Sequence, residues 1–297
     1  IKDEVLNLLE EDQQSFIFLT GAAGTGKSTM LQHIRNQLDL KKIVVAPTGI
    51  AALNIGGSTI NSAFRIGFDT IPEITKSKDP RFAKLLKNLE LLIIDEISMV
   101  RAPMLDAISQ TLQIHRNNSK PFGGVSVFAC GDLFQLPPVV KNHEENIIYS
   151  KYDSVYFFDA HSFKDFTNPI FFELTKSFRQ EEDADFYNLL NNIRLGVDLE
   201  KTIEKINSRC YDPTLESEPF MTLTSRKNRA EDINLYKLSH NDNPEEVIIS
   251  KEFGEIKEND LPAPRELKIK KDAKVIFIKN DSEGRWVNGS VGTVIEC

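Results

Sequence analysis

A glycine-rich segment near the start of the chain has the residue types and spacing of a phosphate-binding loop. Residues 21–28 read Gly-Ala-Ala-Gly-Thr-Gly-Lys-Ser, which is the pattern GxxxxGK[ST]. Backbone N–H groups in such a loop, and the positive end of the helix that follows, cradle phosphates. Lys27 can reach the β- and γ-phosphates, and the Ser28 hydroxyl can bind Mg²⁺. The segment predicts a site for ATP and Mg²⁺. The residues expected to contact ATP are Gly21, Ala22, Ala23, Gly24, Thr25, Gly26, Lys27, Ser28 and Thr29.

A second motif places two acidic residues at the end of an apolar strand candidate. Residues 91–96 read Leu-Leu-Ile-Ile-Asp-Glu. In that position Asp95 would hold Mg²⁺ through its water shell, and Glu96 would accept a proton from the attacking water. Helix-capping acids after a strand give the same letters, but the pairing with a phosphate-binding loop favours hydrolysis. The Asp-Glu pair also favours hydrolysis over kinase chemistry, because a kinase has no use for an activated water.

Two further motifs supply candidate γ-phosphate sensors. Residues 131–138 read Gly-Asp-Leu-Phe-Gln-Leu-Pro-Pro, and the amide of Gln135 could contact the γ-phosphate and the attacking water. A strand-end turn with polar caps explains this segment equally well. Residues 174–180 contain Arg179, which could reach the γ-phosphate as an arginine finger. From spacing alone, an ordinary surface arginine is the simpler interpretation.

Residues 46–64 carry a cluster of hydroxyls and amides together with one aromatic ring. These groups suit contacts to a phosphate backbone, and Phe64 could stack on a base. Judged alone, the segment is explained better as a strand-to-helix turn with polar caps and a core phenylalanine. The candidate DNA contacts are Thr48, Thr59, Asn61, Ser62 and Phe64.

The elements that position these motifs alternate between apolar runs and helical patterns. Continuously apolar runs are typical of strands buried on both faces of a parallel sheet. The expected strands are 16–19, 43–46, 91–94 and 125–129, and the expected helices are 27–38, 49–53 and 102–116. This alternation predicts a doubly wound α/β domain with its ligands at the carboxyl ends of the strands.

The rest of the chain does not show this alternation of strand and helix patterns. Residues 65–88, with two prolines and much charge, are expected to form a small surface insertion rather than a core element. A second region begins near Glu173, with helices expected over 186–195 and 230–238. Residues 241–272 indicate an irregular connector. A final β-rich stretch contains Asn288-Gly289, which predicts a hairpin.

Composition limits the function classes only broadly. The net charge of −8 gives no support for nucleic-acid binding, yet it does not exclude it, because phosphate contacts need only a local lined groove. The sequence contains no apolar run near the ~20 residues that cross a bilayer. Its 3 cysteines lack CxxC spacing, which argues against a disulfide framework or a zinc site and predicts a cytoplasmic protein.

Taken together, these motifs resemble the Pif1-like branch of superfamily 1 DNA helicases. The segments that carry the resemblance are GAAGTGKST at 21–29, APTGIAALNIGGSTINSAF at 46–64, IIDEISMV at 93–100, GDLFQLPPV at 131–139, LTKSFRQ at 174–180, LTSRKNRAEDIN at 223–234 and LPAPRELKIKKDAKVIFIKND at 261–281. The resemblance implies a RecA-like P-loop NTPase domain (1A) over 1–172, with a wedge insertion (1B) at about 65–88. It also implies an incomplete second RecA-like domain (2A) over 173–297 that ends in a β-hairpin region.

The resemblance also implies a function. Such proteins are ATP-driven motors that move 5′ to 3′ on single-stranded DNA and open forked duplex DNA, here as a monomer and nucleoid-associated if bacterial. Lys27, Ser28, Asp95, Glu96, Gln135 and Arg179 then take the catalytic, metal-binding and sensing roles described above. Asn61 stands where the family commonly has histidine. The family's adenine-reading segment and its later motifs are not found between Ile1 and Cys297, so we expect a fragment with impaired coupling.

Other functions remain open at this point. A RecD- or Dda-type helicase is a close alternative, although the Pro-Ala-Pro segment and the Trp286 hairpin favour the Pif1-like branch. A P-loop ATPase switch that acts on protein partners belongs to a different class, and stimulation of ATP hydrolysis by single-stranded DNA would separate the two. The intact Lys27, Asp95 and Glu96 argue against a non-catalytic interaction module for the parent protein, though not for the fragment.

Overall fold

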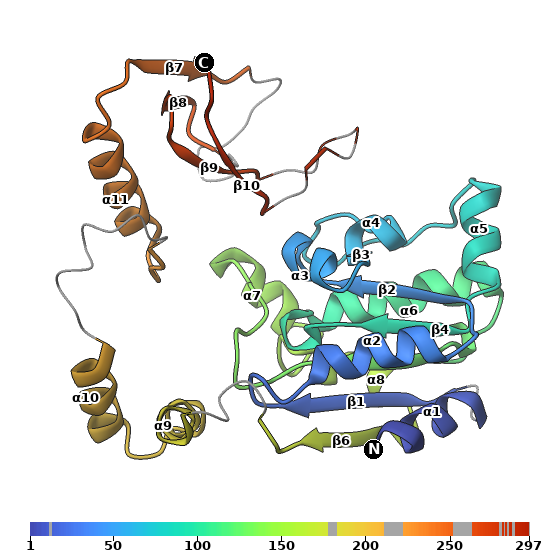
Figure 1. Cartoon of the computed structure of the whole chain (residues 1–297). Coiled ribbons are helices and arrows are strands. Elements are labelled where there is room, and N and C mark those ends of the chain that lie inside the picture. Colours follow the sequence, from blue (N-terminus) through green and yellow to red (C-terminus); the bar gives the residue numbers. More distant parts are fainter. Residues whose placement is uncertain are drawn as a thin grey trace. The chain divides into compact units, whose positions relative to one another are not determined.

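The chain folds into two compact units, Ile1–Tyr211 and Asp212–Cys297 (Figure 1). The computed structural model describes residues 1–11, 14–177, 183–210, 222–251, 263–278, 281, 283, 285–286 and 289–296. None of the helices in these ranges has the length and apolar character needed to cross a membrane. The first unit extends past the boundary expected near residue 173, and a second motor domain beginning there remains our proposal.

A six-stranded sheet forms the centre of the first unit, in the order β3-β2-β4-β5-β1-β6. All of its strand pairs are parallel. The strands are β1 (Phe16–Gly21), β2 (Lys42–Ala46), β3 (Ser58–Thr59), β4 (Leu91–Ile94), β5 (Ser126–Cys130) and β6 (Ile170–Leu174). Every residue of the central strands β4 and β5 is buried, which is why all of them except Ser126 are apolar. The predicted parallel α/β sheet is confirmed.

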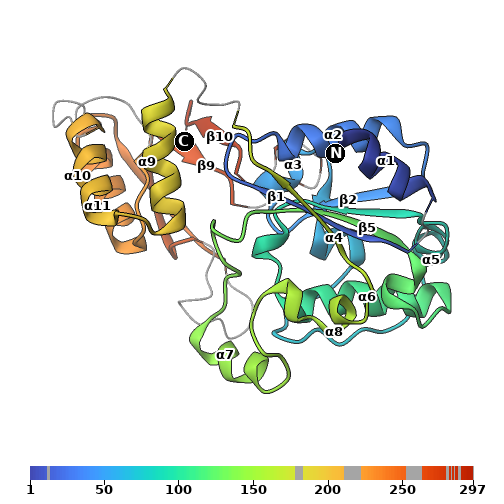
Figure 2. The same ribbon diagram turned by 90° about the horizontal axis from the view of Figure 1, so that it is seen from below.

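Helices cover both faces of this sheet, as Figure 2 shows along its edge. Alternate residues of β1 point to opposite faces, so Ile17 and Leu19 join one apolar cluster while Phe16 and Phe18 join the other. The first cluster packs under α1 (Lys2–Glu11), α2 (Lys27–Gln37) and α3 (Gly49–Asn54). The second packs against α4 (Ile60–Phe64), α5 (Pro80–Lys87) and α6 (Ala102–Arg116). The remaining helices of this unit are α7 (Asn142–Tyr149), α8 (His161–Lys164), α9 (Ala184–Leu195), α10 (Leu199–Cys210) and the short 3-10 turns Ile97–Met99, Pro121–Gly124 and Phe157–Asp159.

Residues 65–88 contribute to the core, contrary to the expected surface insertion. Phe82 and Leu86 of α5 are buried in the cluster that covers α6. The Arg116 guanidinium of α6 donates to the main-chain oxygens of Leu86, Lys87 and Leu89, which satisfies the carbonyls at the end of α5. The sequence did not predict this packing because the segment contains prolines and many charges, and only two side chains of α5 are buried. A wedge role for the segment remains a proposal.

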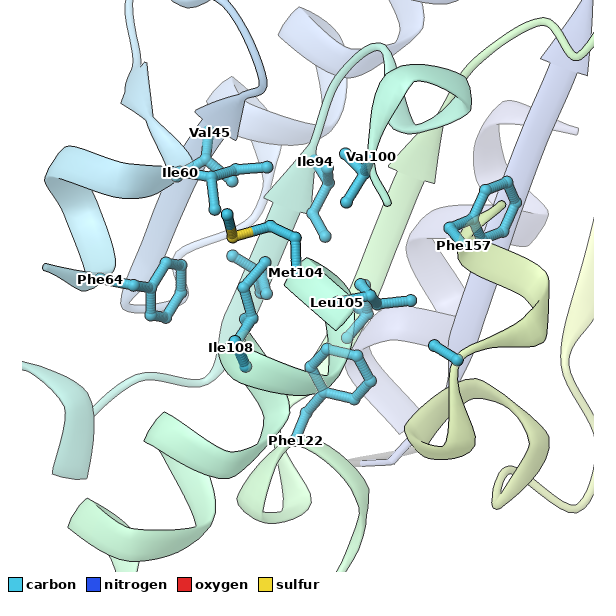
Figure 3. Packing of buried hydrophobic residues seen from close by; sticks show 14 of the residues in the cluster. Val45, Ile60, Phe64, Ile94, Val100, Met104, Leu105, Ile108, Phe122 and Phe157 are labelled. Carbon is cyan, nitrogen blue, oxygen red and sulfur yellow. The ribbon is translucent and has the colours of Figure 1, made fainter. Parts of the chain in front are cut away.

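Phe64 lies in the same core cluster and does not present its ring to a ligand. Its side chain is 2% exposed, and Figure 3 shows it in the cluster with Ile60 and Met104. Base stacking requires a free ring face, which a buried ring lacks. The structure therefore corrects the stacking prediction and favours the core interpretation.

Phe64→Ala is expected to lower the free energy of unfolding by about 3–5 kcal/mol, because it removes a buried ring and leaves a cavity. Urea unfolding measures this loss. Phe68→Ala is the matched control, since that ring is 85% exposed and its removal leaves no buried cavity. A Phe64→Ala protein of unchanged stability and weakened binding to single-stranded DNA would restore the stacking role.

The second unit contains α11 (Lys227–Ser239) and two antiparallel strand pairs. β7 (Glu245–Ile249) pairs with β8 (Glu266–Lys270), so the irregular connector expected over 241–272 is wrong at these positions. Most residues of β7 and β8 are exposed. The two strands therefore lack the alternation of buried apolar and exposed polar residues by which a strand is predicted from sequence. β9 (Lys274–Ile276) pairs with β10 (Val291–Thr293), while Asn288 of the predicted Asn-Gly turn lies outside the described residues.

Candidate nucleotide-hydrolysis site

The glycine-rich loop joins β1 to α2 at the carboxyl edge of the sheet. At Gly21 a Cβ atom would lie 2.6 Å from the main-chain oxygen of Leu174 and 2.7 Å from Thr25 Oγ1, so only glycine fits there. Gly26 has a φ of 93° and precedes α2 without any side-chain cap on the helix. The N–H groups of the first turn of α2 therefore face outward as donors, which suits a phosphate.

Lys27 lies over this loop. Its Nζ donates to the main-chain oxygens of Gly21 at 2.7 Å and Ala22 at 3.0 Å. Burial lowers the pKa of the Lys27 ammonium, while the nearby carboxylates of Asp132 and Glu96 oppose that shift. The ammonium thus rests on two carbonyls within reach of the site where a phosphate would sit.

Asp95 and Glu96 follow β4 at the same edge of the sheet. Asp95 is 7% exposed, and its Oδ1 accepts a hydrogen bond from the main-chain N–H of Glu96 at 3.0 Å. Glu96 has a φ of 50°, a left-handed conformation that is uncommon for a residue with a side chain and occurs often at functional sites. Burial raises the pKa of Asp95, and burial together with the Asp95 charge raises the pKa of Glu96. Raised carboxyl pKa values are typical of groups that accept protons in catalysis.

The turn after β5 brings a third carboxylate to this edge. Asp132 is 1% exposed, and Gln135 Nε2 donates to its Oδ2 at 3.1 Å. Arg194 of α9 donates through Nε to Oδ2 at 3.2 Å and through Nη2 to Oδ1 at 3.1 Å. Burial raises the pKa of Asp132, but the hydrogen bonds from Arg194, Phe134 N–H and Gln135 outweigh it and hold the pKa below its ordinary value.

The site therefore contains two groups to which sequence reasoning gave no role. Asp132 stood inside a motif whose function was assigned to Gln135, and Arg194 stood inside an ordinary helix pattern. Nothing in the spacing between them indicates a contact, because Arg194 follows Asp132 by 62 positions along the chain. Arg179, the predicted finger, lies outside the described residues.

The site suits a nucleotide with its cation. An uncapped helix N-terminus, an ammonium and the exposed Ser28 hydroxyl match the donors that phosphates require. Among the described residues no group of three or more histidine, cysteine or acidic side chains forms a cage for a metal ion. A Mg²⁺ held by Ser28 and Asp95 would therefore complete its ligand shell with phosphate oxygens and water, as is usual for Mg²⁺.

The remaining predicted DNA contacts lie at the ends of β2 and β3. Thr48 Oγ1 accepts from the main-chain N–H of Ala51, and Thr59 Oγ1 accepts from that of Ser62, so both threonines cap short helices. Asn61 Nδ2 donates to the main-chain oxygens of Ile66 and Gly67. The two threonine hydroxyl groups can still donate their protons outward.

Comparison with known proteins links this chain to one family. The family model described as PIF1-like helicase matches residues 1–204. The chain is 34% identical to the ATP-dependent DNA helicase RRM3 of Saccharomyces cerevisiae over 99% of its own length and 42% of that protein. It is 33% identical to the ATP-dependent DNA helicase Pif1 of Bdellovibrio bacteriovorus over 98% of its length and 65% of that protein. The chain thus spans less than two thirds of these curated relatives.

Solved structures agree with this comparison. Pif1 helicase from Bacteroides in complex with ADP-AlF3 and single-stranded DNA superposes with a TM-score of 0.86 at 36% identity, covering 100% of this chain and 69% of that one. A structure of two coordinating Pif1 helicases at forked duplex DNA gives a TM-score of 0.85 at 36% identity, covering 100% of this chain and 70% of that one.

Proposed function

The chain belongs to the PIF1-like helicase family, and from this membership we propose that it carries the ATP-hydrolysing motor of a DNA helicase that moves 5′ to 3′ on single-stranded DNA. One observation carries the proposal. The ammonium of Lys27, the carboxylates of Asp95 and Glu96 and the Asp132–Gln135 pair meet at one edge of the sheet, where their charges act on one another. That arrangement provides the parts that phosphoryl transfer to water requires.

The residues divide the work as follows. Lys27 exchanges its two carbonyl partners for the β- and γ-phosphates, and the N–H groups at the start of α2 donate to the same oxygens. Ser28 and Asp95 would hold Mg²⁺, and the ion would supply positive charge to the phosphate oxygens. Glu96 accepts a proton from the attacking water, and its raised pKa makes it a stronger base than an exposed carboxylate. Gln135 orients that water, and Arg179 keeps the arginine-finger role that the family resemblance implies for it.

The proposed DNA path uses the ends of β2 and β3. Thr48, Thr59, Asn61 and Ser62 lie there, and their polar groups suit phosphate contacts. Related Pif1 structures hold single-stranded DNA in one case and forked duplex DNA in another. We extend both substrates to this chain by family membership. Its 3 cysteines without CxxC spacing support the proposed cytoplasmic location.

Our proposal includes a monomeric motor. The related structure of two coordinating Pif1 helicases on forked DNA makes the oligomeric state a necessary measurement. Light scattering of the full-length protein, with and without a forked duplex, provides it. Forks that carry only a 5′ tail or only a 3′ tail test the direction of movement, and opening of the 3′-tailed fork alone would contradict it.

Single-stranded DNA is expected to accelerate ATP hydrolysis by the full-length protein that contains this chain. The physical reason is that the hydroxyl groups at the ends of β2 and β3 and the hydrolysis site lie at one edge of one sheet, so DNA bound there can influence the catalytic groups. Steady-state ATPase assays with and without oligonucleotide measure the effect. Hydrolysis that is indifferent to DNA would instead favour an ATPase switch that acts on protein partners.

A further inference from the structure

Arg194 of α9 contacts a carboxylate of the hydrolysis site although it lies outside every motif identified in the sequence. Its guanidinium makes two hydrogen bonds to the Asp132 carboxylate and lies over the Phe134 ring, 4.5 Å from the ring centroid. The side chain of Arg194 is 17% exposed and that of Asp132 is 1% exposed. A bidentate contact of this kind restricts the orientation of the carboxylate and also stabilises its negative charge.

Asp132 in turn fixes Gln135. Besides the bond from Gln135 Nε2, the main-chain oxygen of Asp132 accepts from the Gln135 N–H at 3.0 Å, and Oδ1 accepts from the Phe134 N–H at 3.1 Å. The turn is therefore organised around a single buried carboxylate.

The charge of that carboxylate decides which end of the Gln135 amide faces outward. An ionised carboxylate only accepts hydrogen bonds, so it selects the amide orientation in which the NH2 group faces Asp132. The amide oxygen then faces away and can accept a hydrogen bond from water. A protonated Asp132 could donate to the amide oxygen instead, which would reverse the amide and point a donor at the water.

We propose that Arg194 is a positioning residue for water activation: its two hydrogen bonds orient the Asp132 carboxylate, and Asp132 thereby presents the Gln135 amide oxygen to the attacking water. This inference rests on the proposed ATPase function and extends it to a residue on α9. The other charged groups that face Asp132 are Lys27 of α2 and Glu96 after β4. Lys27 is occupied by the loop carbonyls and Glu96 repels the Asp132 charge, so Arg194 is the cation bonded to this carboxylate among the described residues.

Arg194→Ala is expected to lower the kcat of DNA-stimulated ATP hydrolysis about 10- to 100-fold while KM for ATP changes little, because the variant misplaces the water-orienting amide and leaves the phosphate-binding loop intact. Arg194→Lys keeps the charge but loses the two-pronged geometry, so it should recover only part of kcat. Arg209→Ala is the matched control. Arg209 of α10 also pairs with an aspartate, Asp183, and stacks on a ring, Phe186, but at an exposed position away from the site.

The pH profile gives a readout that loss of packing alone would not move. The hydrogen bonds from Arg194 lower the pKa of Asp132, so their loss should raise that pKa relative to wild type and move the acid limb of the kcat profile to higher pH. Asp132→Asn cannot ionise and can present either end of its amide to Gln135. It should lower kcat to a similar extent without shifting the acid limb. The double variant with Arg194→Ala should lose no more kcat than either single variant, because both residues act through the same carboxylate, and additive losses would contradict this.

These outcomes separate the inference from the proposed function. If wild-type protein shows no DNA-stimulated hydrolysis, the proposed function fails before any variant is compared. If wild type is stimulated but Arg194→Ala keeps its kcat and pH profile and loses only thermal stability, the positioning role is overturned. A change in KM alone would also overturn it, since that would assign Arg194 to nucleotide binding.

Discussion

Lys27→Ala is expected to reduce ATP turnover by the full-length protein by at least ~100-fold, and to weaken nucleotide binding, while the fold remains intact. The ammonium lies on the carbonyls of the phosphate-binding loop, and charge-assisted bonds to phosphate are the strong ones. Removal of one preorganised donor at a developing charge costs about 100- to 1,000-fold in kcat in comparable sites. Steady-state ATPase rates and titration with a fluorescent ATP analogue measure the two effects.

Lys42→Ala is the matched control for this prediction. Lys42 Nζ also donates to two main-chain oxygens, those of Arg35 and Leu38, but at the opposite end of the same helix. Its removal should cost stability at the end of α2 and leave turnover unchanged. Wild-type turnover in Lys27→Ala, or equal losses in both variants, would show that Lys27 serves the helix and not the nucleotide.

The parts of the site that could be predicted from the sequence are those formed by residues close to one another along the chain. The spacing of residues 21–28 defines a loop conformation by itself, because glycines permit the required backbone angles and the lysine follows at a fixed distance. The same holds for Asp95 and Glu96, which must lie at the edge of the sheet once 91–94 is a buried strand. The carboxyl ends of parallel strands meet at one edge, so the convergence of these motifs follows from topology.

The parts that the sequence missed depend on tertiary contacts. The interpretation of Phe64 changed because a ring in a polar segment can face a ligand or the core, and the packing of α4 decides between them. Similarly, the inward face of α5 consists of two residues, too few to reveal a period. Arg194 reaches Asp132 only because α9 returns to the end of β5, and no local pattern encodes that return. Long-range contacts of this kind require the assembled fold.

Glu96→Gln is expected to lower kcat for ATP hydrolysis about 100- to 10,000-fold while nucleotide binding is retained, because an amide keeps the size of the side chain but cannot accept the proton from water. Single-turnover hydrolysis and equilibrium binding of a fluorescent ATP analogue separate the two steps. Glu204→Gln, an exposed change on α10, removes the same charge and should leave both unaffected. Lost binding together with lost hydrolysis would assign Glu96 to the nucleotide pocket instead of to the water.

The same substitution is expected to stabilise the nucleotide-free protein at neutral pH. Burial and the Asp95 charge raise the pKa of Glu96 in the folded state above its unfolded value. The protonated form therefore favours folding, a contribution that is full below the unfolded pKa of about 4.3 and is lost as pH rises through the higher folded pKa. Glutamine mimics the protonated form at every pH, so Glu96→Gln should melt at a higher temperature than wild type near pH 7. The difference should shrink as pH falls toward about 4. Thermal unfolding across this pH range measures it, and a variant that is less stable than wild type at pH 7 would show that Glu96 is held by favourable contacts and is not strained by burial.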